Sequence, residues 1–125
     1  MINREKIINN YIQGYNEFDV DQMVIDFDEN IIFKNIQNGE TNMTLIGLQE
    51  FVKQAEQAKS YFSVRRQTIK SFRYLEDEME IEIDYFAVLA INLSNGLKEG
   101  QALNLKGKTV FKFMGNKISE LTDIS

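Results

Sequence analysis

The sequence predicts an α+β domain in which helices come first and strands fill most of the rest. Apolar residues recur at helical spacing near the N-terminus, which favours an amphipathic helix. From about residue 60 onward, turn signals separate four segments that are typical of strands. One strand and one further helix lie between these regions. The predicted order is α-α-β-α-β-β-β-β, in a single domain that covers residues 1–125.

The first helix is predicted from one apolar stripe that comprises Ile7, Ile8, Tyr11, Ile12 and Tyr15. A short second helix should begin after Asp19, which is a good N-cap and has Gln22 three residues further on, as in a capping box. Phe18 and Met23 occupy the two positions of a hydrophobic staple.

The first strand should place Ile31, Phe33 and Asn35 on one face, because strand side chains alternate. Residues 37–40 are expected to form a turn. A third amphipathic helix is predicted over about residues 45–58, from the apolar positions Leu48, Phe51, Val52, Ala55 and Ala58.

The last four strands are predicted over about residues 60–75, 78–93, 101–114 and from 117 to the end. Between the first two, a two-residue loop at 76–77 sets a register that can be checked. Tyr74 should oppose Met79, Phe72 should oppose Ile81, and Arg73 should oppose Glu80. The register then puts Lys70 opposite Ile83, so a β-bulge is expected nearby.

The composition excludes several classes of site. Apolar residues make up 43% and charged residues 26%, as in ordinary globular proteins. The chain has no cysteine and no histidine, which removes thiolate chemistry, the usual neutral-pH base and the commonest metal ligand. We therefore expect no cofactor and no metal. The acidic run Glu80, Glu82 and Asp84 is expected to be a solvated surface.

The formal net charge is −5, which argues against nucleic-acid binding through phosphates. No apolar run approaches the length of a membrane span, and no signal peptide is evident, so no membrane partner and a cytoplasmic location are expected. The neighbouring Arg65 and Arg66 are expected to form a pair on the hairpin surface, the alternative being a site for an anionic ligand.

Residues 7–35, IINNYIQGYNEFDVDQMVIDFDENIIFKN, resemble the opening of the nuclear transport factor two-like superfamily, which includes ketosteroid isomerases and SnoaL-like polyketide cyclases. The resemblance continues to Glu50-Phe51 and more loosely through residues 110–113. It implies a cone-shaped roll, in which a curved, mixed and mostly antiparallel sheet packs on three N-terminal helices.

The resemblance also implies candidate site residues. Tyr11 falls where the isomerases keep an oxyanion-hole tyrosine, Asn35 where they keep the proton-carrying aspartate, and Thr109 where they keep a protonated aspartic acid. An amide has no accessible pKa, so Asn35 cannot carry the proton and the catalytic set is incomplete. The expected ligand-binding residues are Tyr11, Asn35, Thr109, Phe33, Tyr85, Phe111 and Asp123.

Three functions are compatible with these residues. The first is a binding domain for a small, largely apolar molecule with a polar end. The second is an isomerase, cyclase or dehydratase that uses an inward carboxylate, for which Asp84, Glu120 and Asp123 are the candidates. The third is an interaction module whose cone is filled by its own aromatic side chains, namely Phe33, Phe62, Tyr85, Phe86, Phe111 and Phe113.

A homodimer through the sheet is also expected. The segment Tyr85–Ile91 is apolar at nearly every position, so alternation cannot direct all of it toward one core. A second copy of the chain is the commonest way to cover such a face.

Overall fold

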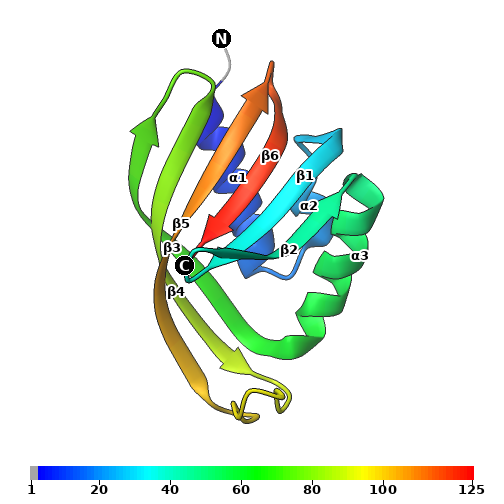
Figure 1. Ribbon diagram of the computed structural model, residues 1–125, viewed down its shortest axis with the longest axis vertical. Coiled ribbons are helices and arrows are strands. Elements are labelled where there is room, and N and C mark those ends of the chain that lie inside the picture. The colour runs from blue at the N-terminus through cyan, green and yellow to red at the C-terminus, as the bar shows by residue number, and fades with distance from the viewer. Residues whose placement is uncertain (1–2) are drawn as a thin grey trace.

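The computed structural model describes residues 3–125, which form three helices and a six-stranded sheet (Figure 1). The helical elements are α1 (Arg4–Asn16), α2 (Val20–Met23), α3 (Leu48–Ala58) and a 3₁₀ turn, η1 (Lys59–Tyr61). The strands are β1 (Phe27–Gln37), β2 (Glu40–Ile46), β3 (Phe62–Tyr74), β4 (Glu78–Leu89), β5 (Ala102–Met114) and β6 (Lys117–Ile124). Within the described part of the chain, no helix is long and apolar enough to cross a membrane.

The sheet is mixed and mostly antiparallel, as predicted. Its strand order is β2-β1-β6-β5-β4-β3, in which β1 and β6 run parallel and the other neighbours run antiparallel. In Figure 1 the sheet curves around α1, and α3 covers the side next to β1 and β2. The sheet is open, with β2 and β3 as its edges. This architecture confirms the predicted α+β cone.

The predicted order of elements was wrong by one strand. Residues 40–46 form β2, which pairs with β1 across a turn where Asn38 and Gly39 both have positive φ angles. The segment ETNMTLI lies at the sheet edge with mostly exposed side chains, so it lacks the apolar alternation of a half-buried strand. As a consequence, α3 begins at Leu48 rather than near 45. The strand expected to reach 93 ends at Leu89.

The predicted register of the β3–β4 hairpin is confirmed. Tyr74 opposes Met79, Phe72 opposes Ile81, and Arg73 opposes Glu80. The register shifts between Ile69 and Ser71, so Ile69 rather than Lys70 opposes Ile83. The bulge keeps the apolar residues of both strands on one face.

Helix α1 buries its apolar stripe against the inner face of the sheet. Ile8, Tyr11 and Ile12 are buried in one core with residues from both helices and strands. A Cβ atom at Gly14 would lie 2.8 Å from the backbone nitrogen of Met23, so the glycine allows α2 to approach α1. The other buried members of this core are Val20, Met23, Phe27, Ile31, Phe51, Met79, Ile81, Phe111, Phe113, Ile118 and Leu121.

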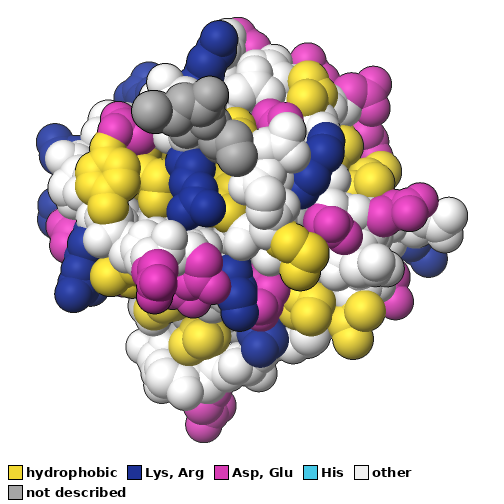
Figure 2. Space-filling view, turned by 90° about the horizontal axis from the view of Figure 1, so that it is seen from above, with side chains coloured by type: hydrophobic (Ala, Val, Ile, Leu, Met, Phe, Trp, Pro, Cys, Tyr) yellow, Lys and Arg dark blue, Asp and Glu magenta, His cyan; other side chains and the backbone are white. Residues whose placement is uncertain are grey.

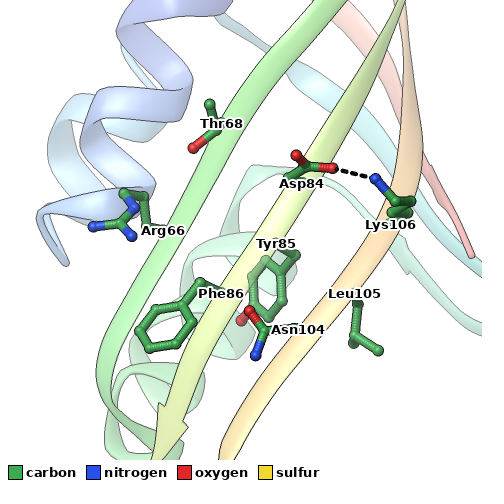
Figure 3. A pocket seen from close by; sticks show the side chains of 8 residues that line it. All are labelled: Arg66, Thr68, Asp84, Tyr85, Phe86, Asn104, Leu105 and Lys106. Carbon is green, nitrogen blue, oxygen red and sulfur yellow. Dashed lines mark hydrogen bonds and ion pairs between the residues drawn. The ribbon is translucent and has the colours of Figure 1, made fainter.

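The outer face of the sheet carries charged and apolar side chains together. In β4, Ala87 and Leu89 are buried on the inner face, whereas Phe86 and Val88 are half-buried on the outer face. Ion pairs connect neighbouring strands on this face, among them Lys106–Asp84 at 3.1 Å. A groove of about 370 Å³ runs over β3, β4 and β5, and Figure 3 shows Phe86 and the Asp84–Lys106 pair within it.

We propose that this outer face joins two copies of the chain. Val64 is 43% exposed and pairs with Val88, which lies beside Phe86, so these residues form an apolar patch on the outer face. Basic and acidic side chains border the patch together, namely Arg66, Lys106 and Asp84. A two-fold interface brings the same surface of both copies together. The basic side chains that border the patch on one copy can then pair with the acidic side chain on the other.

Sedimentation equilibrium tests this proposal directly. The protein should sediment as a dimer at tens of micromolar, and Val64→Lys should shift it toward the monomer because it places a charge in the apolar patch. Val64 is already exposed in the single chain, so the variant should remain folded. Gln13→Lys, on the exposed side of α1, is the matched control. A wild-type monomer at this concentration would contradict the proposal.

Candidate functional site

A pocket of about 220 Å³ opens on the inner face of the sheet, next to the C-terminal end of α1. Gly107 lies opposite Ile83 in the β4–β5 pair, and a Cβ atom there would lie 3.1 Å from the Ile124 carbonyl oxygen, so the glycine allows the end of β6 to lie close against β5. The residues that line the pocket are Tyr15, Asn35, Gln67, Ile83, Tyr85, Leu105, Lys106, Gly107, Lys108, Thr109, Asp123, Ile124 and Ser125.

Asp123 places a carboxyl group in this pocket. It pairs with Thr109 across β5 and β6, and the Thr109 hydroxyl donates a 2.8 Å hydrogen bond to its Oδ1 atom. Burial raises the pKa of Asp123 to about 6, although the hydrogen bond from Thr109 opposes the shift. Thr109 itself is 1% exposed, so it belongs to the floor of the pocket.

The other two candidate carboxylates lie outside the pocket. Asp84 is on the outer face, where a hydrogen bond from Lys106 is the largest cause that lowers its pKa. Glu120 is also on the outer face and pairs with Lys112 at 3.4 Å. Of the three, Asp123 alone lines the inner pocket.

Two tyrosine hydroxyls meet at the opposite wall. The Oη atoms of Tyr15, from α1, and Tyr85, from β4, lie 2.9 Å apart and share a hydrogen bond. Burial raises the pKa of both hydroxyls, so both are protonated at neutral pH. The hydrogen bond between the two hydroxyls uses one of their two protons, so the other proton can be donated to a ligand.

Two side chains hold the end of α1 against β3. The Asn16 side-chain oxygen accepts a hydrogen bond from the backbone nitrogen of Gln67 at 2.7 Å. The Asn16 side-chain nitrogen donates a hydrogen bond to the backbone carbonyl oxygen of Gln67 at 3.1 Å. Arg65 Nε donates to the Tyr15 carbonyl oxygen at 2.7 Å. These contacts fix the position of Tyr15 and direct the Gln67 side chain toward the pocket.

Asn35 lines the pocket, and its amide nitrogen is hydrogen-bonded within the sheet. Its Nδ2 atom donates to Asn42 Oδ1 at 2.8 Å, across the β1–β2 pair. Asn42 in turn donates to Gln37 Oε1 at 3.2 Å. The Asn35 side-chain carbonyl oxygen is the group that remains for a ligand.

Tyr11, Phe33 and Phe111 lie in the apolar core rather than among the residues that line the pocket. The Tyr11 ring stacks on Phe27 with centroids 5.6 Å apart and meets Phe111 edge-on at 5.8 Å. Phe33 packs edge-on against Phe51 at 5.6 Å. Burial raises the pKa of the Tyr11 hydroxyl, and the charge of Asp123 raises it further, so Tyr11 lies within the electrostatic reach of the pocket.

Three residues that line the pocket were not predicted as site residues from the sequence, namely Tyr15, Gln67 and Gly107. Tyr15 belonged to the helical stripe and was assigned to the core with its neighbours. The surface assignment of Arg65 was wrong, because Arg65 is 3% exposed whereas Arg66 is exposed. Strand alternation was the signal that could have separated them, since two adjacent residues of a strand face opposite sides. Within residues 3–125, no group of acidic side chains is arranged to hold a metal ion.

Comparison with known proteins identifies the fold. No protein-family model matches the sequence, and no curated protein matches it either. Among solved structures, a candidate SnoaL-like polyketide cyclase from Shewanella denitrificans has a TM-score of 0.78 at 15% identity, over 96% of this chain and 88% of that chain. A protein of unknown function from Burkholderia pseudomallei, described as nuclear transport factor two-like, has a TM-score of 0.76 at 12% identity, over 98% and 90%.

A third structure is a hypothetical protein from Catenulispora acidiphila with a ketosteroid isomerase-like fold, in complex with trimethylamine. It has a TM-score of 0.76 at 12% identity, over 94% of this chain and 83% of that chain. The fold is therefore that of the nuclear transport factor two-like superfamily, as the resemblance predicted.

The raised pKa of Asp123 should appear in the pH dependence of stability. The Asp123 carboxyl group has a pKa of about 6 in the folded protein, against an ordinary value of 3.8. Asp123 therefore favours folding at acid pH, and this contribution is lost as the pH rises from about 4 to above 6. Allowing for partial exposure of the group, the loss is on the order of 2 kcal/mol.

Urea unfolding of the wild type and Asp123→Asn at several pH values measures this effect. The variant should gain stability relative to the wild type by about 2 kcal/mol between acid and neutral pH. Asp84→Asn is the control, since the lowered pKa of Asp84 gives a dependence of opposite sign. Parallel stability curves for wild type and Asp123→Asn would show that this carboxyl titrates as if exposed.

Proposed function

We propose that the protein binds a small molecule with an apolar body and a polar end in the pocket beside α1. The observation that carries this proposal is the convergence of Asp123, the Tyr15–Tyr85 pair and Gln67 on one small pocket. Ile83, Leu105 and Ile124 supply the apolar part of its lining. A largely apolar pocket with a few convergent polar groups is the usual form of a small-molecule site.

The polar groups of the pocket have more hydrogen-bonding capacity than the protein uses. The Tyr15–Tyr85 pair retains one proton, and Asp123 has a second oxygen beyond the one that accepts from Thr109. A half-buried polar group without a partner costs on the order of 1–3 kcal/mol. Binding of a ligand with a matching carbonyl, hydroxyl or amine group would recover this energy. The Catenulispora acidiphila protein of the same fold, which holds trimethylamine, supports a small organic ligand.

A thermal-shift screen of hydrophobic carbonyl compounds and phenols tests the proposal. Compounds that stabilise the wild type should bind Tyr85→Phe and Asn35→Leu about tenfold more weakly, the cost of one lost hydrogen bond. Tyr74→Phe, at an exposed tyrosine of the hairpin, should bind like the wild type. If no compound stabilises the wild type and Asn35→Leu is the more stable protein, the interaction module with a filled cone replaces this proposal.

Acid–base catalysis is the second candidate function, and the inward carboxyl group of Asp123 favours it. A general base works best when its pKa lies near the working pH, and that of Asp123 is about 6. Such a base could take a proton from the carbon next to a ligand carbonyl. The electron pair of the C–H bond would then form the enolate, whose oxygen could accept a hydrogen bond from the tyrosine pair.

Deuterium exchange from solvent into a bound ketone measures this step. Exchange should accelerate as the pH rises through about 6, and Asp123→Asn should slow it ~10²–10⁴-fold. Asp84→Asn should leave the rate unchanged, since that carboxylate lies on the outer face. Equal exchange rates for wild type and Asp123→Asn would remove the enzymatic candidate and leave the binding function in place.

A further inference from the structure

Arg65 places a positive charge in the interior of the protein. It is 3% exposed, and its second terminal nitrogen, Nη2, is buried without a hydrogen-bond partner among the described residues. None of the ion pairs found within residues 3–125 includes Arg65. Guanidinium groups remain charged under all ordinary conditions, so burying this one has a desolvation cost.

Capping of α1 explains only part of this arrangement. The last turn of α1 has no basic residue, and Arg65 Nε donates to the Tyr15 carbonyl oxygen at the end of the helix. A positive charge there stabilises the helix dipole. This contact uses one N–H group, and a neutral donor could also make it. The capping contact therefore does not by itself require a charged residue.

The charge lies directly behind one wall of the pocket. The guanidinium carbon sits 3.9 Å from the centroid of the Tyr15 ring and 4.5 Å from that of Phe18. The hydroxyl that bonds to Tyr85 extends from the same Tyr15 ring. Arg65 also lowers the pKa of the hydroxyls of Tyr11, Tyr15 and Tyr85, which burial raises more strongly. Its positive charge therefore acts against burial, which disfavours negative charge at this wall.

Asp123 does not neutralise Arg65. Asp123 is on β6 and Arg65 is on β3, with β5 and β4 between them. Three strand spacings correspond to roughly 14 Å across the sheet. Burial raises the pKa of Asp123 and the hydrogen bond from Thr109 opposes this shift, while Arg65 is not among its causes. The pocket therefore has a negative end at β6 and a positive end toward β3.

We propose that the Tyr15–Tyr85 wall binds an ionised oxygen of the ligand, of the phenolate or enolate class. The free proton of the hydroxyl pair donates to this oxygen, and Arg65 balances its charge from behind the Tyr15 ring. Arg65 is a positioning residue, since it acts through Tyr15 rather than by touching the ligand. The inference rests on the proposed function, that the pocket holds a small molecule.

Two probes of nearly equal shape test the inference: 4-nitrophenol, which ionises, and its methyl ether, 4-nitroanisole, which does not. Above the pKa of the phenol, the wild type should bind 4-nitrophenolate about tenfold more tightly than the ether, the gain of a charge-assisted hydrogen bond. The absorption band of the phenolate reports the ionisation state of the bound probe. The apparent pKa of the bound phenol should therefore be lower than that of the free phenol.

Arg65→Gln keeps a donor for the Tyr15 carbonyl and removes the charge. It should weaken phenolate binding about tenfold, leave ether binding unchanged, and raise the apparent pKa of the bound phenol by about one unit. Arg65→Lys should restore most of the phenolate preference. Arg66→Gln, at the exposed neighbour on the outer face, should change neither probe. A purely structural Arg65 predicts a lower melting temperature with unchanged probe preference, which would overturn the inference.

Tyr15→Phe provides a second variant if Arg65→Gln does not fold, because it retains the ring against Arg65 and removes only the hydroxyl. It should lose the phenolate preference of the wild type. Equal wild-type affinity for the two probes overturns this inference and leaves the proposed function standing. Failure of both probes to bind counts against the inference and against the proposed function for aromatic ligands.

Discussion

The attachment of α1 to edge strand β3 is the constraint on which the site depends. The Asn16 side chain bonds to both backbone groups of Gln67, and Arg65 bonds to the Tyr15 carbonyl oxygen. These contacts hold the last turn of the helix over the inner face of the sheet. They place Tyr15 against Tyr85 and so form one wall of the pocket. Without them, the helix would still bury Ile8 and Ile12, but the pocket would have no fixed boundary.

The sheet separates two kinds of electrostatic environment. On its outer face, Asp84 contacts Lys106 and Lys70 in water, where such ion pairs contribute little to stability. Acidic and basic side chains are likewise interspersed over the end of the molecule seen in Figure 2. On the inner face, neither Asp123 nor Arg65 takes part in the ion pairs found within residues 3–125, and their strands are three spacings apart along the sheet. Charged residues therefore keep the outer face soluble, whereas on the inner face they create an electrostatic field.

The parts of the fold that depend on residues close together in the sequence could be predicted. Both the helical stripe of α1 and the register of the β3–β4 hairpin follow from local spacing, so they were confirmed. Strand β2 could not be predicted, because an exposed edge strand needs no apolar alternation. Its formation depends on pairing with β1 and on the turn at Asn38, where the backbone adopts a positive φ.

The candidate site could be predicted only in part. The pairing of Thr109 with Asp123 brings two expected residues together, and Asn35 and Tyr85 also line the pocket. The sequence contains no direct signal for the curvature of the sheet, which decides that Phe111 enters the core while Thr109 lines the pocket. The meeting of Tyr15 with Tyr85 joins residues that are 70 positions apart, and local patterns do not report such contacts.

Asn16 has a consequence for the behaviour of β3 among other chains. An edge strand presents unpaired N–H and C=O groups that can recruit a strand from another molecule. At Gln67, the amide of Asn16 donates to the carbonyl and accepts from the N–H, as the backbone of an added strand would do. A single side chain thus occupies the middle of this edge, and a foreign strand could not pair along its full length without displacing the helix. The residue that positions the helix therefore also blocks strand pairing at this point of the sheet edge.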